Sequence, residues 1–187
     1  MKLHIKNMVC DRCLRTVKNI LEKNNILYSR IELGEIDTVE QISVTKLMEF
    51  KLELESEGFE LIDGKNGKII ERIKNIIIEH IHYNKNHDKK LNFSQLLENK
   101  LLKDYTYISN LFSETEGITI EKYIILQKVE RVKELLVYDE LSLSEIAFQM
   151  NYSSVAHLSS QFKKTTGLTP TYFRTIKEHK RKTLDKV

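Results

Sequence analysis

The sequence predicts an α+β fold: an N-terminal βαββαβ unit followed by an all-α unit that contains two helix-turn-helix motifs. Two observations support this prediction. The first 62 residues alternate between strand and helix signals, whereas the chain after residue 68 reads as helix. In addition, the second half matches itself when it is shifted by 50 residues, which indicates a duplicated structural unit.

Six segments of the first unit follow in the order strand, helix, strand, strand, helix, strand. The strands carry alternating apolar residues, and the helices carry apolar residues at helical spacing. Gly34 allows a turn between the middle strands, Ser43 can cap the second helix, and Gly58 can end it. This order fits an antiparallel sheet with both helices on one face. The expected strands are 3–6, 27–33, 35–42 and 59–62, and the expected helices are 11–25 and 43–56.

Residues 63–68, DGKNGK, combine turn-forming and charged residues and therefore predict a domain boundary. We expect a first domain over residues 1–63, a connecting helix and loop over 64–90, and a second domain over 91–187. The apolar stretch 69–83 is expected to close the second domain or to dock the two domains together.

Charge is unevenly distributed along the chain. Residues 1–66 hold 10 Lys/Arg and 12 Asp/Glu, a net charge of −2, whereas residues 163–187 hold 8 and 2, a net charge of +6. The basic C-terminus indicates a phosphate-rich partner, although an ordinary solubilising tail explains the charge equally well.

Composition also bears on location. No apolar run approaches the ~20 residues of a membrane span, and the first eight residues lack the apolar core of a signal peptide. We therefore expect a cytoplasmic protein with no membrane partner. Because cytoplasmic thiols stay reduced, a structural disulfide is a poor explanation for Cys10 and Cys13.

The internal repeat aligns residues 108–123 with residues 158–173. Apolar positions fall on apolar positions, turn glycines on glycines, and candidate helix caps on candidate helix caps, so both copies are expected to fold alike. The matched pairs are Ile108/Leu158, Phe112/Phe162, Gly117/Gly167, Thr119/Thr169 and Tyr123/Phe173, and upstream Asn92/Ser142, Leu97/Ala147 and Asp104/Ser154.

Each copy reads as two helices joined by a short turn. In the second copy, Ser142 and Glu145 have the spacing of a capping box, Asn151 tolerates the left-handed turn, and Gly167 ends the second helix. This is the spacing of a helix-turn-helix whose second helix enters the DNA major groove. A helical repeat without a DNA role is the alternative.

Residues 90–178 resemble the DNA-binding domain of the AraC/XylS family of bacterial transcription regulators. The resemblance rests on LSEIAFQMNYSSVAHLSSQFKKTTGLTPTYFR (143–174), and it implies a long connecting helix over 119–139. The family usually has Gly where this chain has Asn151. The resemblance implies a transcription regulator that binds double-stranded DNA, with RNA polymerase as a further candidate partner.

Helical spacing nominates the side chains that read DNA bases. With Leu158 and Phe162 facing inward, the residues on the opposite face point outward, and they match the groove-facing positions of the family. None is Arg or Lys, the residues best suited to guanine, so we expect a site that favours A·T pairs. The predicted base-reading residues are Thr106, Ser109, Asn110, Val155, Ala156, Ser159 and Ser160.

Basic residues toward the C-terminus of the chain are expected to bind phosphates, which positions a protein without reading sequence. They are Lys163, Lys164 and Arg174, with Lys180, Arg181 and Lys182 in the tail. His157 is expected to be half-buried and to pack rather than to read bases.

MVCDRC (8–13) has the pattern M-x-C-x-x-C between a strand and a helix. Residues 1–63 thereby resemble the heavy-metal-associated domain of copper chaperones and metal-pumping ATPases, which implies a ferredoxin-like fold with Met8 in the core. A helix N-terminus favours thiolates, and Cys10 and Cys13 suit Cu(I) in near-linear coordination or supply half of a tetrahedral zinc site. The alternative is a retained fold whose cysteines have no function.

Together the two resemblances predict an AraC-type regulator that responds to a soft metal ion, or to thiol state, through Cys10 and Cys13. A second copy of the chain, bridged by one ion, is a candidate partner. The competing hypotheses are a metal-handling chaperone or buffer whose helical half docks a protein, and a redox-switched regulator. No enzyme is expected, because the sequence offers no nucleophile–base set, phosphate-binding glycine loop or paired carboxylates.

Overall fold

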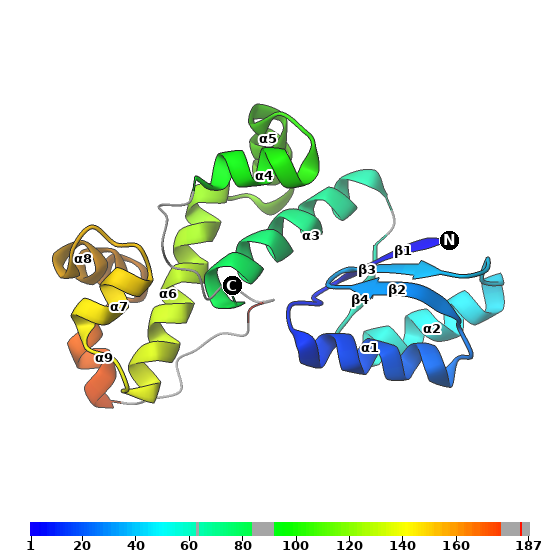
Figure 1. The fold of residues 1–187 in the computed structure, drawn as a ribbon, viewed down its shortest axis with the longest axis horizontal. Coiled ribbons are helices and arrows are strands. Elements are labelled where there is room, and N and C mark those ends of the chain that lie inside the picture. Colours follow the sequence, from blue (N-terminus) through cyan, green and yellow to red (C-terminus); the bar gives the residue numbers. More distant parts are fainter. Residues whose placement is uncertain (63, 84–91, 177–183, 185–187) are drawn as a thin grey trace. The chain divides into compact units, whose positions relative to one another are not determined.

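The computed structural model describes residues 1–62, 64–83, 92–176 and 184. The chain divides into two compact units, Met1–Ile76 and Ile77–Val187, which we call the N-terminal unit and the C-terminal unit (Figure 1). Among the described residues, no helix has the length and apolar character needed to cross a bilayer.

The N-terminal unit contains a four-stranded antiparallel sheet in the order β2-β3-β1-β4, with α1 and α2 together on one face (Figure 1). The elements follow the predicted order, but the third strand is shorter than expected. It ends at Thr38, whose hydroxyl donates to the Glu40 carbonyl at 2.7 Å and so helps turn the chain away from the sheet. The elements are β1 Lys2–Lys6, α1 Asp11–Lys23, β2 Tyr28–Glu32, β3 Glu35–Thr38, α2 Val44–Ser56, β4 Glu60–Leu61 and α3 Lys65–Ile78.

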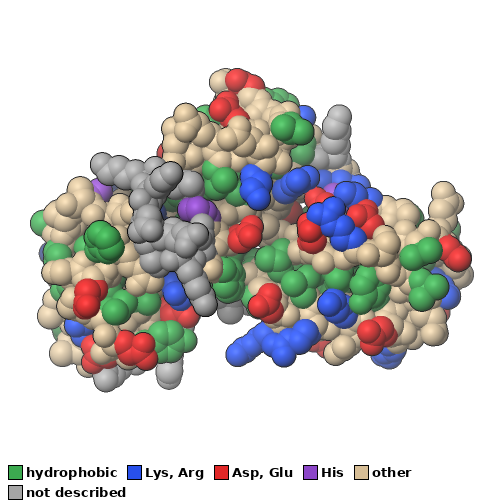
Figure 2. All heavy atoms as spheres, in the orientation of Figure 1, with side chains coloured by type: hydrophobic (Ala, Val, Ile, Leu, Met, Phe, Trp, Pro, Cys, Tyr) green, Lys and Arg blue, Asp and Glu red, His purple; other side chains and the backbone are tan. Residues whose placement is uncertain are grey.

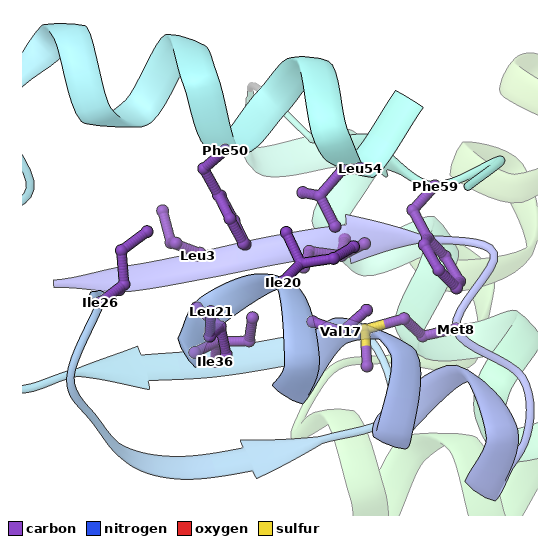
Figure 3. Close-up of a cluster of buried hydrophobic side chains, with 11 residues drawn as sticks. Leu3, Met8, Val17, Ile20, Leu21, Ile26, Ile36, Phe50, Leu54 and Phe59 are labelled. Atoms are coloured by element: carbon purple, nitrogen blue, oxygen red, sulfur yellow. The ribbon is translucent and has the colours of Figure 1, made fainter. Parts of the chain in front are cut away.

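The core of the N-terminal unit lies between the sheet and the two helices (Figure 3). Leu3 and Ile5 alternate along β1 and are buried, as the period of a half-buried strand requires. Met8 is fully buried beside Val17, in agreement with its expected place in the core. The strand-to-helix loop that carries the two thiols is therefore anchored to the core at its start.

The second half of α3 contacts the sheet on the side opposite to α1 and α2 (Figure 1). The Asn75 side-chain amide donates to the Leu33 carbonyl at 3.2 Å, and the Arg72 guanidinium lies 3.5 Å from the Glu35 carboxylate. A methyl group on Gly34 would come within 2.6 Å of Asn75 Nδ2, so the helix approaches the β2–β3 turn closely. Residues 64–76 thus belong with the sheet, whereas the sequence suggested a connecting segment over 64–90.

The C-terminal unit is helical and is organised around the long helix α6. Thr119 caps α6 by accepting from the Lys122 amide, and Asp139 ends it in the left-handed conformation, close to the bounds expected for the connector. The described elements are the π-helical turn η1 Glu79–Tyr83, α4 Phe93–Leu101, α5 Tyr105–Glu116, α6 Ile120–Tyr138, α7 Leu143–Gln149, α8 Val155–Thr166 and α9 Pro170–Ile176.

The two halves of the repeat use equivalent aromatic contacts. Phe112 lies 5.5 Å from Tyr123, and Phe162 lies 5.5 Å from Phe173, measured between ring centroids. All four rings are buried. Because these pairs occupy matched positions of the repeat, each recognition helix is anchored by the same type of contact to the helix that follows it.

Candidate nucleic-acid interface

Two helix-turn-helix motifs are present, α4–α5 and α7–α8. In both, a residue with positive φ lies in the turn: Leu102 at 53° in the first and Asn151 at 55° in the second. Asn151 therefore adopts the conformation expected of it. Asn is among the residues that best tolerate this region, whereas Leu102 bears a steric cost there.

Matched side chains cap the helices of both motifs. Ser142 and Glu145 form the predicted capping box, and Asn92 caps α4 at the equivalent position. The recognition helices α5 and α8 begin at the caps Asp104 and Ser154. Both helices end at a left-handed glycine, Gly117 or Gly167. The predicted repeat is thus a structural repeat.

The first six residues of α5 and α8 have the same burial pattern. Ile108 and Leu158 are fully buried, and the other five positions of each segment are half-buried or exposed in the same order. Among the predicted base-reading residues, Thr106, Asn110, Ala156 and Ser160 are exposed, whereas Ser109, Ser159 and Val155 are half-buried. Val155 also packs against the hydrophobic core of the C-terminal unit.

The predicted phosphate contacts have different environments. Lys163 and Lys164 are exposed in the last turn of α8. The Arg174 guanidinium instead donates to the Leu141 carbonyl at 2.8 Å and lies 3.2 Å from the Asp139 carboxylate, so it ties α9 to the segment after α6. The predicted contacts Lys180, Arg181 and Lys182 lie outside the described residues.

The recognition helices carry two exposed rings, Tyr107 on α5 and His157 on α8, and the sequence analysis missed Tyr107. Tyr107 is 45% exposed, and the Lys103 ammonium lies 5.1 Å from its ring centroid. The matched residue His157 is exposed, not half-buried as expected, but it does pack, with its ring centroid 5.3 Å from that of Tyr152, and it shares a 3.0 Å hydrogen bond with the Ser153 hydroxyl. The 50-residue shift that pairs position 107 with position 157 was the available signal.

The N-terminal unit carries mixed charge. On the face drawn in Figure 2, basic and acidic side chains are interspersed over this unit. In the unit as a whole, several basic and acidic side chains are paired, for example Lys2 with Glu35 at 3.4 Å and Lys23 with Glu53 at 3.0 Å. Its surface on that face therefore differs from the single-sign basic surface that marks a phosphate-binding domain.

The two thiols lie together at the start of α1. Cys10 is the N-cap residue, and its sulfur lies 3.4 Å from that of Cys13. Both residues are half-buried and free. Burial raises the pKa of the Cys13 thiol, and the backbone groups of Val9 and Cys10 offset only part of that increase. For Cys13, desolvation therefore outweighs the helix N-terminus that was expected to favour the thiolate.

Among the described residues, no group of three or more His, Cys, Asp and Glu side chains has the arrangement of a metal site. The thiol pair therefore offers two sulfur donors to a metal ion. Two soft thiolates fit Cu(I) in near-linear coordination, whereas tetrahedral zinc requires four ligands.

A profile described as "Helix-turn-helix domain" matches residues 99–176. The xylose operon regulatory protein of Escherichia coli K12 is 31% identical over 101 residues, covering 54% of this chain and 26% of that protein. The melibiose operon regulatory protein of the same strain is 26% identical over 98 residues, covering 52% of this chain and 32% of that protein. The chain thus spans about a quarter to a third of these curated relatives.

Solved structures are also similar, over different shares of the chain. The C-terminal domain of AraT, a response regulator from Geobacillus stearothermophilus, has 25% identity and a TM-score of 0.50, covering 58% of this chain and 84% of that one. ToxT from Vibrio cholerae has a TM-score of 0.53 at 14% identity, and the match covers 89% of this chain and 68% of ToxT. At this identity the similarity is one of fold alone. Residues 99–176 therefore match a helix-turn-helix domain, and they are similar to the C-terminal domain of AraT.

Proposed function

We propose that the chain is a DNA-binding transcription regulator of the AraC type. The observation that carries this proposal is the pair of recognition helices, α5 and α8, which share one burial pattern and turn short polar side chains outward. The similarity to regulators of the xylose and melibiose operons supports the same conclusion. RNA polymerase and a second copy of the chain stay predicted partners.

Short side chains without a guanidinium or ammonium group favour contacts with A·T pairs. Asn110 is suited to adenine, and the Ala156 methyl group is suited to the thymine methyl group. Ser109, Ser159 and Ser160 bond with either type of base. The predicted operator is therefore rich in A·T pairs at the positions that the recognition helices face.

Selection of binding sites from random duplex DNA with the full chain tests this function. We expect an A·T-rich motif, and Asn110→Ala should relax the preference at one position. Lys163→Ala should instead weaken binding to every sequence alike, because a phosphate contact carries no sequence information. A G-rich motif, or no enrichment at all, would contradict the proposal.

We further propose that the N-terminal unit is a ferredoxin-like domain of the heavy-metal-associated type and that its thiol pair makes the regulator responsive to a soft metal ion or to thiol oxidation. The 3.4 Å separation of the Cys10 and Cys13 sulfurs supports this proposal. Cu(I) fits this pair of donors better than zinc does. Once bound, a metal ion would replace the thiol protons and hold the two sulfurs in one arrangement.

Asn7 connects the thiol loop to α3. The Cys13 thiol donates to the Asn7 carbonyl at 3.7 Å, and the Asn7 backbone N–H donates to the buried Glu71 carboxylate at 3.4 Å. Asn7 itself has a φ of 71°. A change at the Cys13 sulfur removes its ability to donate this hydrogen bond, so the contact between the loop and α3 depends on thiol chemistry.

Anaerobic titration of the full chain with Cu(I) in competition with a chelator, followed by DNA binding in both states, tests the response. We expect one Cu(I) per thiol pair and a change in operator affinity, both absent in Cys10→Ser/Cys13→Ser. Copper binding without DNA binding would favour the metal-handling alternative. Equal DNA affinity in the loaded, oxidised and reduced forms would rule the response out.

A further inference from the structure

The two recognition helices pack alike but carry opposite charge. From its cap to its last residue, α5 (104–116) contains Asp104, Glu114 and Glu116 and no Lys or Arg. The equivalent stretch of α8 (154–166) contains Lys163 and Lys164 and no Asp or Glu. The two helices thus differ by five formal charges, −3 against +2, on the same scaffold.

The differences occur at equivalent positions. Glu114 stands where the second motif has Lys164, and both side chains are exposed. Asp104 stands where the second motif has Ser154, and both cap the recognition helix. Hydrogen bonds from the side chain and backbone of Thr106, and from the Tyr107 backbone, lower the pKa of Asp104, so this cap keeps its negative charge.

The basic residues that the first motif has outside α5 do not offset its negative charge. Lys100 is exposed near the end of α4, and the half-buried Lys103 lies over the Tyr107 ring. Against these two stand four acidic residues between Asn92 and Gly117, whereas the second motif, Ser142 to Gly167, has two basic residues and one acidic residue.

These charges act where DNA is approached. The N-terminal residues of a recognition helix lie nearest the base edges, and basic side chains around the motif neutralise phosphates and release counterions. A carboxylate facing a phosphate is repelled, and it releases no counterion. The first motif therefore offers base contacts at an electrostatic cost, and the second offers base contacts together with phosphate contacts.

We propose that the two motifs are unequal: α7–α8 anchors the protein on the DNA backbone, and α4–α5 contributes sequence discrimination without a phosphate anchor. The first motif engages DNA only where its base contacts through Thr106, Ser109 and Asn110 offset the repulsion from Asp104 and Glu114. This inference rests on the proposed DNA-binding function, and it assigns non-specific affinity to the second motif.

Matched double variants of the full chain separate the two motifs. Binding to random-sequence duplex DNA is measured between 50 and 200 mM salt, where each phosphate contact contributes about a 3.5-fold loss of affinity. Lys163→Ala/Lys164→Ala should reduce the salt-dependent loss about 12-fold, which corresponds to two contacts. Lys100→Ala/Lys103→Ala should leave it unchanged.

A gain-of-charge variant tests the same inference in the opposite direction. Glu114→Lys should tighten binding and increase the salt-dependent loss about 3.5-fold, because it gives α5 the charge that α8 has at this position. Glu22→Lys on α1 makes the same change in net charge in the N-terminal unit and should have no such effect. Circular dichroism verifies that each variant is folded.

The proposal that the motifs are unequal would be overturned if the two double-alanine variants reduced the salt-dependent loss of affinity equally, or if Glu114→Lys did not tighten binding. DNA binding itself would still be established. A wild-type chain that binds no duplex DNA would instead overturn the proposed function, and the inference with it.

Discussion

Replacing Arg174 with alanine distinguishes a structural role from a phosphate contact. The guanidinium donates to the Leu141 carbonyl at 2.8 Å and lies 3.2 Å from the Asp139 carboxylate. Both interactions hold α9 against the chain that follows α6. We therefore expect Arg174→Ala to destabilise the C-terminal unit.

The magnitude follows from the two interactions. A hydrogen bond from a charged donor contributes about 1.5–3 kcal/mol. The ion pair adds little, about 0–1 kcal/mol, because the side chains of Arg174 and Asp139 are 27% and 43% exposed. We expect a loss of about 2 kcal/mol in the free energy of unfolding, with faster hydrogen exchange in α9.

Urea unfolding and the salt dependence of DNA binding together form the assay. Arg174→Ala should lower the free energy of unfolding and leave the slope of log affinity against log salt unchanged. Lys163→Ala is the matched control, with unchanged stability and a slope that is smaller by about 0.9. If Arg174→Ala reduces the slope and leaves stability intact, the phosphate contact expected from the sequence is correct and the structural reasoning is wrong.

Three further predictions concern the cores and the sheet. Phe162→Ala should lower the free energy of unfolding of the C-terminal unit by about 3–5 kcal/mol, measured with urea, because it leaves a cavity beside Phe173. A loss below about 1 kcal/mol would contradict the packing described above. Gly34→Ala should lower the free energy of unfolding by about 1–3 kcal/mol and speed hydrogen exchange in α3, because φ of Gly34 is +82° and the new methyl group would collide with Asn75. Unchanged hydrogen exchange in α3 would mean that the helix does not approach the β2–β3 turn. Burial, aided by Lys68, lowers the pKa of His4, so the unfolded chain takes up this proton first and the N-terminal unit should lose stability as the pH falls through about 6.5. His4→Gln should flatten that dependence, and an equally steep profile in the variant would assign it to another group.

Local patterns sufficed for most of the secondary structure. Alternation of apolar residues placed the strands, and helical spacing with the Ser43 cap placed the helices, because both signals depend only on neighbouring residues. The repeat was equally visible, since a duplicated unit must bury the same positions twice. The third strand was predicted too long because the Thr38 side chain, not a Gly or Pro, ends it.

Contacts between distant parts of the sequence were not predictable in this way. The Asn75 side-chain amide reaches a carbonyl 42 residues earlier, and no local pattern indicates that α3 contacts the β2–β3 turn. Arg174 reads as a surface cation until the Leu141 carbonyl is placed beside it. For Cys13, the sequence showed the helix N-terminus but not the burial that raises the thiol pKa.

The equivalent packing of α5 and α8 has a practical consequence for engineering. Ile108 and Leu158 are both fully buried, as are Phe112 and Phe162. The packing of each motif's interior therefore does not depend on which residues lie on its exposed surface. Exposed residues such as Ala156 and Ser160 can therefore be transplanted from one helix to the other, whereas Val155 packs against the core and has to stay in place. Under the proposed function, a chimaera that carries the exposed residues of α8 on both helices would present the same side chains to DNA twice.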